Sequence, residues 1–188
     1  MSKEIIIVTI SLGNDGAERI LTELARQWHQ DGHKITVIQT SPNRYGTEYA
    51  LPEGIEQIQI HTTSSNKIIR FLQEIKVLIG ILKKRPRATC LSFLSASSFI
   101  LAISSWFVKN RIVFSERNNP RKVPVGKHQQ MLRDFAFHFA DAIVFQTEDA
   151  KSYFSHTIQS RGHIIPNPIN GNLPEPYEGE RDKTIVTA

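Results

Sequence analysis

Cysteine is almost absent from this 188-residue chain, which contains only Cys90. A single cysteine excludes an intramolecular disulfide framework and any zinc site built from cysteines. Because Cys90 lies inside an apolar run, we expect it to be a small buried core residue. Such sparse cysteine use fits a reducing compartment, and we expect a cytoplasmic protein. The seven histidines show no metal-ligand spacing, so no metal site and no cofactor is expected.

The sequence also lacks low-complexity segments, internal repeats and a secretory signal. Its longest stretch without a charged residue runs from Ala88 to Val108, about the length that crosses a bilayer. The serines in the middle of that stretch favour a buried strand, a turn and a buried helix. A membrane span is the alternative interpretation.

The net charge is modestly positive, at +5. A basic excess suits anionic partners such as nucleic acid, phosphate groups or acidic lipid. An excess of this size does not choose among the three.

Strand-like apolar runs alternate with helix-like periodic segments along most of the chain. Strands are predicted at 4–10, 34–40, 55–61, 89–94, 111–115, 142–145 and 163–165, and helices at about 17–29, 66–84, 96–107, 127–140 and 148–160. Repeated strand–helix alternation predicts an α/β fold, a Rossmann-like parallel sheet with helices on both faces. We assign residues 1–168 to this domain.

The composition changes after Asn167. Prolines and glycines lie among acidic residues over 169–182, which is typical of an interdomain linker. The last six residues, KTIVTA at 183–188, read as the beginning of a further apolar strand. We therefore expect them to start a second domain that the chain does not contain.

Ligands of open parallel sheets bind outside the carboxyl ends of the strands, which directs attention to three loops. The first contains Gly13, Asn14, Asp15, Gly16 and Ala17. Its glycines permit a tight backbone turn, and the N-terminus of the following helix can bind an anion. A plain strand-to-helix turn is the alternative. The loop lacks the middle glycine of the dinucleotide pattern, and the strand at 34–40 ends without the acid that would hold a ribose, which together disfavour a nicotinamide-dependent oxidoreductase. It is not a P-loop either, because no Gly-Lys-Ser/Thr follows.

The second loop, after the strand at 111–115, concentrates Glu116, Arg117, Asn118 and Arg121. Arginine offers a planar fork for phosphate or carboxylate, and Glu116 could orient or deprotonate a hydroxyl. A solvated loop with a local ion pair is the alternative. The third region follows the strand at 142–145. There Thr147 is predicted to cap a helix that begins with Glu148, and capping without a binding role is the alternative interpretation.

Five motifs, in order, carry a resemblance over essentially the whole chain. They are GNDGAERILTELARQWHQDGHKITVI, LSFLSASSFILA, IVFSERNNPR, FADAIVFQTEDAKSYF and HIIPNPIN. Together they resemble the N-terminal domain of retaining glycosyltransferases of family 4, which have the GT-B fold. The nearest of these relatives build bacterial polysaccharides or lipid-linked glycans.

The resemblance implies that this half holds the acceptor, a glycan or a polyprenyl-diphosphate-linked glycan, rather than nucleic acid. The Gly13–Ala17 loop would approach the diphosphate of a nucleotide-sugar donor, expected to be UDP-linked. The Glu116–Arg117 stretch would meet the reacting sugar, and Asn118, Arg121, Thr147, Glu148 and Asn167 would contribute to binding. Many members carry a histidine where this chain has Arg117, which removes a histidine-based role. The family's donor-gripping glutamates lie in the second domain, so these 188 residues are expected to be inactive alone.

A non-catalytic phosphate-, glycan- or membrane-binding module is the second hypothesis, and a reading frame that continued beyond Ala188 would argue against it. The predicted helix at 66–84 is the reason for considering membrane binding. The apolar stripe predicted to pack on the sheet consists of Ile68, Leu72, Ile75, Ile79 and Leu82. Four further apolar residues are not needed for that packing and lie beside basic residues: Phe71, Val77, Leu78 and Ile81. Apolar groups flanked by basic ones suit peripheral contact with an anionic membrane.

Overall fold

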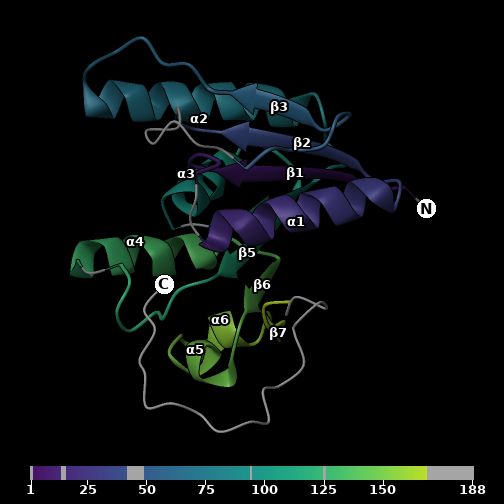
Figure 1. The fold of residues 1–188 in the computed structure, drawn as a ribbon. Coiled ribbons are helices and arrows are strands. Elements are labelled where there is room, and N and C mark those ends of the chain that lie inside the picture. Colours follow the sequence, from purple (N-terminus) through teal and green to yellow (C-terminus); the bar gives the residue numbers. More distant parts are fainter. Residues whose placement is uncertain (1, 14–15, 42–48, 94, 125, 169–188) are drawn as a thin grey trace, which may run out of the picture.

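The computed structural model describes residues 2–13, 16–41, 49–93, 95–124 and 126–168. The predicted linker and second-domain start, 169–188, lie outside these residues, as do Asn14 and Asp15 of the first loop. Within the described part, seven parallel strands form one sheet in the order β3-β2-β1-β4-β5-β6-β7. This arrangement confirms the Rossmann-like α/β fold predicted from the alternation of segments (Figure 1).

The strands are short and mostly apolar. Their bounds are β1 (Glu4–Thr9), β2 (Lys34–Gln39), β3 (Glu56–Gln59), β4 (Thr89–Ser92), β5 (Arg111–Glu116), β6 (Ala142–Phe145) and β7 (Gly162–Ile164). The central strand β1 pairs in parallel with both β2 and β4, placing Ile6 between Thr36 and Cys90. A strand paired on both sides and covered on both faces reads as a continuous apolar run, as β1 does.

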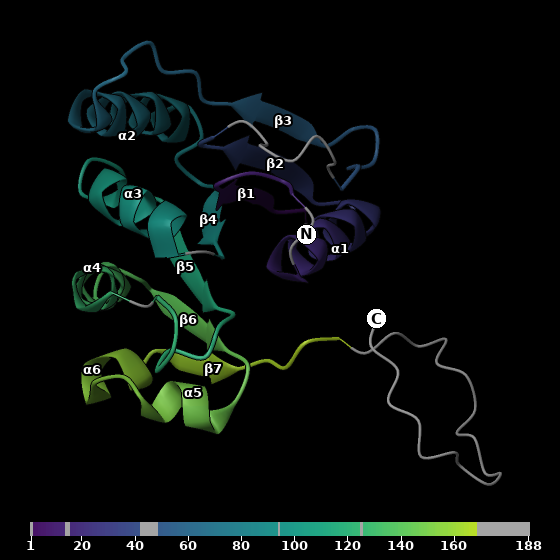
Figure 2. The same ribbon diagram turned by 60° about the vertical axis from the view of Figure 1, so that its left-hand side comes forward.

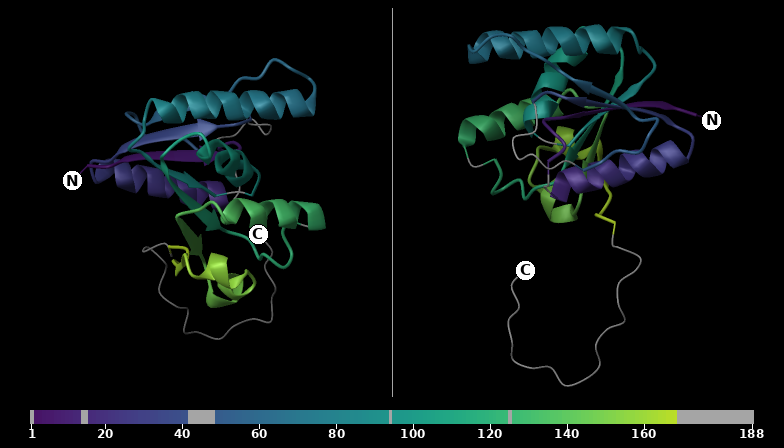
Figure 3. Two further views of the ribbon diagram at one scale, coloured as in Figure 1. Left: turned by 180° about the vertical axis from the view of Figure 1, so that it is seen from behind. Right: turned by 45° about the horizontal axis from the view of Figure 1, so that its top comes forward.

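Helices cover the two faces of the sheet unequally. One face carries α1 (Gly16–Gln30), and the other carries a row of α2 (Lys67–Lys83), α3 (Ser95–Ser105) and α4 (Lys127–Phe137). Figure 2 shows the sheet nearly edge-on with α1 alone on one side. The view from behind in Figure 3 brings the row of three helices forward.

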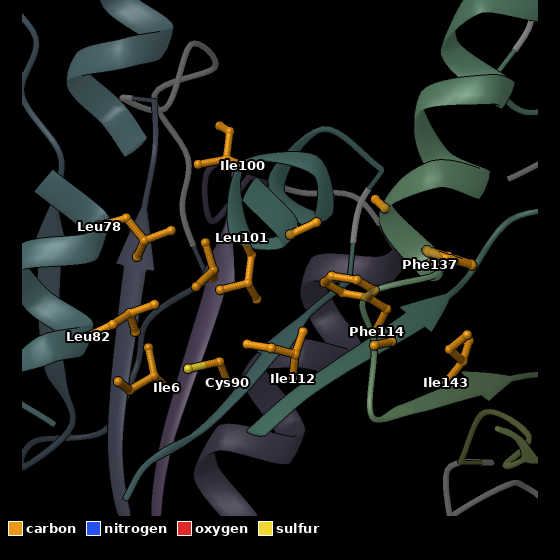
Figure 4. Close-up of a cluster of buried hydrophobic side chains, with 14 of the residues drawn as sticks. Ile6, Leu78, Leu82, Cys90, Ile100, Leu101, Ile112, Phe114, Phe137 and Ile143 are labelled. Carbon is orange, nitrogen blue, oxygen red and sulfur yellow. The ribbon is translucent and has the colours of Figure 1, made fainter. Parts of the chain in front are cut away.

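The main hydrophobic core lies between the sheet and this row of helices (Figure 4). Leu78 and Leu82 of α2, together with Leu101 of α3, are fully buried. Cys90 is buried in the same cluster, as predicted. A smaller core joins α1 to the other face through Leu21, Ala25, Val37 and Leu91, among others.

Two predictions about helices need correction. In the predicted seam of α2, Ile75 and Leu82 are buried and Ile79 packs against the core, as expected. Ile68 and Leu72, however, are 72% and 58% exposed, and Leu78, predicted to be left over, is fully buried. The predicted helix at 148–160 is two short helices, α5 (Glu148–Ser152) and α6 (His156–Gln159). The break occurs where Phe154 is drawn into the core and Ser155 adopts an extended conformation.

The uncharged stretch from 88 to 108 forms β4 and α3, as the serine cluster predicted. The alternative interpretation, a membrane span, finds no support there. No helix among the described residues is long and apolar enough to cross a bilayer.

Candidate functional site

A groove of about 560 Å³ opens at the carboxyl edge of the sheet. Its floor begins at Ile10, Thr40 and Ser41, which follow β1 and β2 directly. The N-terminal halves of α2 and α4 flank it, and both extend beyond the tips of the central strands (Figure 1). Because ligands of open α/β sheets bind at this edge, the groove is the leading candidate site.

The groove has an apolar side and a polar side. Phe71 of α2 and Phe99 of α3 line the apolar side, with ring centroids 5.7 Å apart in a stacked pair. Leu132 of α4 and Val123 also contribute there, and each is about two-fifths exposed. An amphipathic ligand could therefore bury an apolar part against these side chains.

The polar side extends into a second hollow of about 300 Å³, lined by hydroxyl-bearing residues and His61. Thr40, Ser41, Arg70 and Glu74 line both spaces. Burial raises the pKa of Glu74, and the neighbouring Arg70 guanidinium, 3.9 Å away, opposes that rise. Hydroxyls beside an arginine–carboxylate pair can hydrogen bond the hydroxyl groups of a sugar.

Arg133 of α4 fixes the loop that follows β5. Its side chain is fully buried, and Nη1 donates to the carbonyl oxygens of Pro120 and Val123 at 3.1 and 2.9 Å. The guanidinium also lies over the Phe154 ring, 4.8 Å from its centroid. These contacts hold the 117–124 loop, which carries Asn118 into the lining of the groove.

Glu116, predicted to be catalytic, is only 4% exposed and does not line the groove. Its Oε1 accepts a hydrogen bond from the backbone N–H of Asn118 at 3.0 Å, and its Oε2 lies 3.7 Å from Arg133 Nη1. Burial raises its pKa to about 7, although the Asn118 hydrogen bond and Arg133 both favour the carboxylate. Its surroundings are therefore those of a residue that shapes the loop.

Arg117 points to the opposite face of the sheet from Glu116, because successive side chains of an extended strand alternate. It lines a trough on the α1 face with Leu24, Trp28 and Phe93. Its guanidinium lies 4.9 Å from the centroid of Phe93, and its Nε and Nη1 are buried without a hydrogen-bond partner. Burial lowers the pKa of Arg117. The two predicted catalytic residues therefore do not converge.

The glycine loop meets α1 on the same face as Arg117. Gly13 is buried and Gly16 is exposed at the first position of α1, whereas Ala17 is half-buried. A Cβ added at Gly16 would find no atom within 4 Å, so the space over this helix end is open. Ser11, just before the loop, donates from its hydroxyl to the buried Glu18 carboxylate at 3.2 Å. An exposed helix start can accommodate an anion, and Arg117 places a cation on the same face of the sheet.

The remaining predicted residues gather around the end of β6. Thr147 caps α5 by accepting the N–H of Ala150, as predicted, and Glu148 is exposed at the first position of that helix. Arg121 reaches Asp149 at 3.3 Å. Asn167 Oδ1 accepts a hydrogen bond from Gln146 at 3.1 Å. Arg121 is therefore engaged on the α5 side, away from the face that carries Arg117.

Sequence reasoning missed the contributions of α2 and α4 to the groove. Lys67 and Arg70 lie in the first turn of α2, which has no acidic residue. Cations at a helix N-terminus oppose the helix dipole, and that unfavourable placement is a signal the sequence contains. Among the described residues, no group of three His, Cys, Asp or Glu side chains could hold a metal ion.

The model of the family described as Glycosyltransferase Family 4 matches residues 14–172, most of the chain. Among curated proteins, none is a significant sequence match. Similar solved structures include Anabaena Alr3699/HepE in complex with UDP and glucose, at TM-score 0.70 and 12% identity over 89% of this chain and 45% of that one.

Sucrose-phosphate synthase from Thermosynechococcus elongatus is similar at TM-score 0.67 and 7% identity, covering 87% of this chain and 48% of that one. The lipopolysaccharide outer core galactosyltransferase WaaB is similar at TM-score 0.66 and 12% identity, covering 89% and 46%. At such identities these similarities establish the fold alone, that of the GT-B glycosyltransferases, and this chain spans about half the length of each. The family match covers most of the described fold and the loops around its carboxyl edge, and the chain therefore belongs to Glycosyltransferase Family 4.

Proposed function

We propose that this chain is the acceptor-binding half of a glycosyltransferase that moves a hexose or N-acetylhexosamine from a nucleotide sugar with retention of configuration. The groove at the carboxyl edge, with its stacked Phe71–Phe99 pair and its polar corner at Arg70 and Glu74, is the observation that carries the proposal. An aromatic wall beside hydroxyls and an ion pair suits a glycan with an apolar portion.

The donor is a nucleotide sugar, and we favour a UDP-linked one because HepE was solved with UDP and glucose. In this proposal the donor diphosphate approaches the open start of α1 at Gly16 and Ala17. Arg117 lies on that face with unpartnered N–H groups, whereas Arg121 is engaged with Asp149. Arg117 is therefore the better partner for the diphosphate, and Glu116 acts as a positioning residue through the loop.

The acceptor is a glycan or a polyprenyl-diphosphate-linked glycan, and the protein works in the cytoplasm at the inner face of the membrane. Residues 1–188 alone transfer no sugar. Rate enhancement requires donor and acceptor to be held together, and the similar enzymes are about twice as long as this chain.

The test is a binding measurement on residues 1–188 by NMR amide shifts, with a polyprenyl-diphosphate disaccharide in detergent and with UDP. We expect the acceptor to shift amides lining the groove, and Arg70→Glu to weaken its binding at least tenfold. Arg87→Glu, at an exposed position outside the groove, is the matched control. Acceptor binding that Arg70→Glu leaves unchanged would contradict the proposed groove.

A non-catalytic phosphate-, glycan- or membrane-binding module is the second candidate. The open start of α1, on the face of the sheet that also carries Arg117, favours it, because an anion can bind there without a reaction. Turnover separates the two candidates. A transferase requires sugar transfer once the donor-binding half is supplied, whereas a module binds its ligand and releases it unchanged.

A further inference from the structure

The sheet is open on one face beyond α1. On β5 and β6, the side chains that point to the row of three helices are buried in the main core, and they are Ile112, Phe114, Ile143 and Phe145. Val113 and Val144 point the other way and are only partly buried. Among the described residues, α1 is the only helix on that side, and it packs mainly against β2 (Figure 2).

The sequences of β5 and β6 are those of strands covered on both faces. The run Ile-Val-Phe occurs in each strand, so apolar residues occupy both of the alternating sets. Parallel sheets in α/β proteins are covered by helices on both faces, and strands buried in this way are apolar throughout. The open face of β5 and β6 therefore indicates a missing cover.

This open face forms the trough of about 560 Å³ that Arg117 lines. Apolar side chains from β4, β5, β6, α1 and the segment after β7 line it, and they are Leu91, Val113, Val144, Leu24, Trp28 and Ile165. Charged residues lie at its two ends, Lys3, Arg111 and Asp141 at the amino ends of the strands and Arg117 beyond the carboxyl end of β5. The trough thus has an apolar middle along the strands and charged ends.

A buried hydroxyl in the trough also lacks a partner. Ser115 is 4% exposed, lines the trough, and its Oγ has no hydrogen-bond partner among the described residues. Buried polar groups in folded proteins are nearly always hydrogen bonded. The element that covers the trough is therefore expected to bring a polar group to Ser115.

The dimensions of the trough suit one helix. The six residues of β5 extend about 20 Å, which is the length of a helix of about 13 residues. Residues 169–188 are poorly suited to supply it. Their first part is interrupted by Gly171, Pro174, Pro176 and Gly179, and only six residues follow the predicted linker.

We propose that an amphipathic helix of the donor-binding half packs into this trough and completes the sheet of this domain. The chain leaves β7 beside the trough, since Ile165 lines it, and the similar structures are about twice as long as this chain. The proposal rests on the proposed function in one respect, the existence of a donor-binding half. The trough and the groove share no lining residue, so this contact joins the two halves and leaves the groove free.

Thiol labelling tests whether the trough is covered. Cys90 is buried and is the only cysteine of the chain, so a single introduced thiol can be followed alone. Val144→Cys is compared in residues 1–188 and in the protein produced from the complete reading frame, with any further cysteines replaced by serine. We expect 5,5′-dithiobis(2-nitrobenzoate) to label the thiol readily in residues 1–188 and at least roughly tenfold more slowly in the longer protein.

Val77→Cys is the matched control, because Val77 lies on α2, on the other side of the sheet, and is 38% exposed. It should react at the same rate in both proteins. A second pair of variants measures stability. Val144→Lys should lower the melting temperature of the longer protein by at least about 5 °C, because the lysine is buried there, and change that of residues 1–188 by less than about 2 °C. Val77→Lys should have little effect on either.

Equal labelling of Val144→Cys in the two proteins would overturn the proposal. Slow labelling in residues 1–188 alone would also overturn it, because the chain would then cover its own trough. Activity of the longer protein separates this proposal from the proposed function. Sugar transfer by a protein whose trough stays open contradicts the helix alone, whereas a protected trough without sugar transfer contradicts the transferase alone.

Discussion

Arg133 Nη1 lies 3.7 Å from Glu116 Oε2, and the two side chains are 0% and 4% exposed. The pair joins α4 to the carboxyl end of β5 beneath the loop that carries Asn118. Because Arg133 also donates to two carbonyl oxygens of that loop, a single buried side chain sets the shape of one wall of the groove.

Replacing Arg133 by methionine should lower the free energy of unfolding by about 3 kcal/mol. The change leaves the carbonyls of Pro120 and Val123 without their donor and Glu116 without its cation. Arg133→Lys should restore little of the lost stability, since an ammonium group cannot reproduce the planar fork of hydrogen-bond donors. Urea unfolding measures the effect.

The matched control for this change is Arg121→Met, which removes an exposed arginine–aspartate pair instead. We expect it to change stability by less than about 0.5 kcal/mol, because exposed ion pairs contribute little. Equal losses for the two arginines would refute a special role for Arg133.

Glu116 should make stability depend on pH. Burial raises its pKa from 4.5 to about 7, so between those values the folded chain holds a proton that the unfolded chain has lost. Stability therefore falls as pH rises through this window and levels off above about 7, with a total loss of up to about 3 kcal/mol. Glu116→Gln should remove this component. Urea unfolding at pH 5 and pH 8 compares the two proteins, and an equal fall in both would rule out Glu116 as its source.

The sequence did not separate Glu116 from Arg117, because the predicted strand ended at 115 and left both residues in the following loop. In the structure β5 continues to Glu116, and the next side chain, that of Arg117, lies on the opposite face of the sheet, as alternation along an extended chain requires. The partner of Glu116 could not be predicted, because Arg133 lies 17 positions further along the chain and meets it only through packing. Local patterns identified the elements and the Thr147 cap, whereas the groove depends on contacts between elements.

The prediction of which α2 residues face the sheet failed for a different physical reason. The 17 residues of this helix extend about 25 Å, whereas the six residues of β1 extend about 20 Å. The first turn of α2 therefore passes beyond the sheet, and Ile68 is exposed. The helix is also rotated relative to the predicted stripe, because Leu78 is fully buried and Phe71, next to the exposed Leu72, packs against the core. A helix this rich in apolar residues offers two overlapping stripes, and periodicity alone does not choose between them.

Arg117 should contribute more than Arg121 to the binding of a diphosphate. Its buried N–H groups lack partners on the α1 face, whereas Arg121 already contacts Asp149. Calorimetric titration with inorganic diphosphate should show binding weakened at least fivefold by Arg117→Gln and by Gly16→Val, and little changed by Arg121→Gln. A Cβ at Gly16 meets no atom within 4 Å, so a folded Gly16→Val protein is expected. Unchanged affinity in both test variants would exclude this face as the anion site.

Cys90 should be inert in the folded protein. Its thiol is buried in the main core, and burial, helped by the charge of Glu4, raises its pKa to about 12. The reactive thiolate is therefore scarce at pH 8, and a reagent cannot reach the sulfur. We expect no reaction with 5,5′-dithiobis(2-nitrobenzoate) in buffer and one reacting thiol per chain in urea. Rapid labelling of the folded chain would mean that this part of the core opens readily.

Replacement by alanine should lower the stability of the protein at Gly162 and raise it at Gly80. A Cβ at Gly162 would lie 2.6 Å from Cε2 of Phe145 and 3.1 Å from the backbone oxygen of Gln159, so Gly162→Ala must displace a core ring. Overpacking of this kind costs about 1–3 kcal/mol. At Gly80, within α2, a Cβ meets nothing within 4 Å, and Gly80→Ala should stabilise the protein by about 0.5–1 kcal/mol through the higher helix propensity of alanine. Thermal and urea unfolding of both variants measure whether each substitution raises or lowers stability. A neutral Gly162→Ala would show that β7 and Phe145 adjust freely, and the packing of β6 against β7 would then not be a fixed part of the fold.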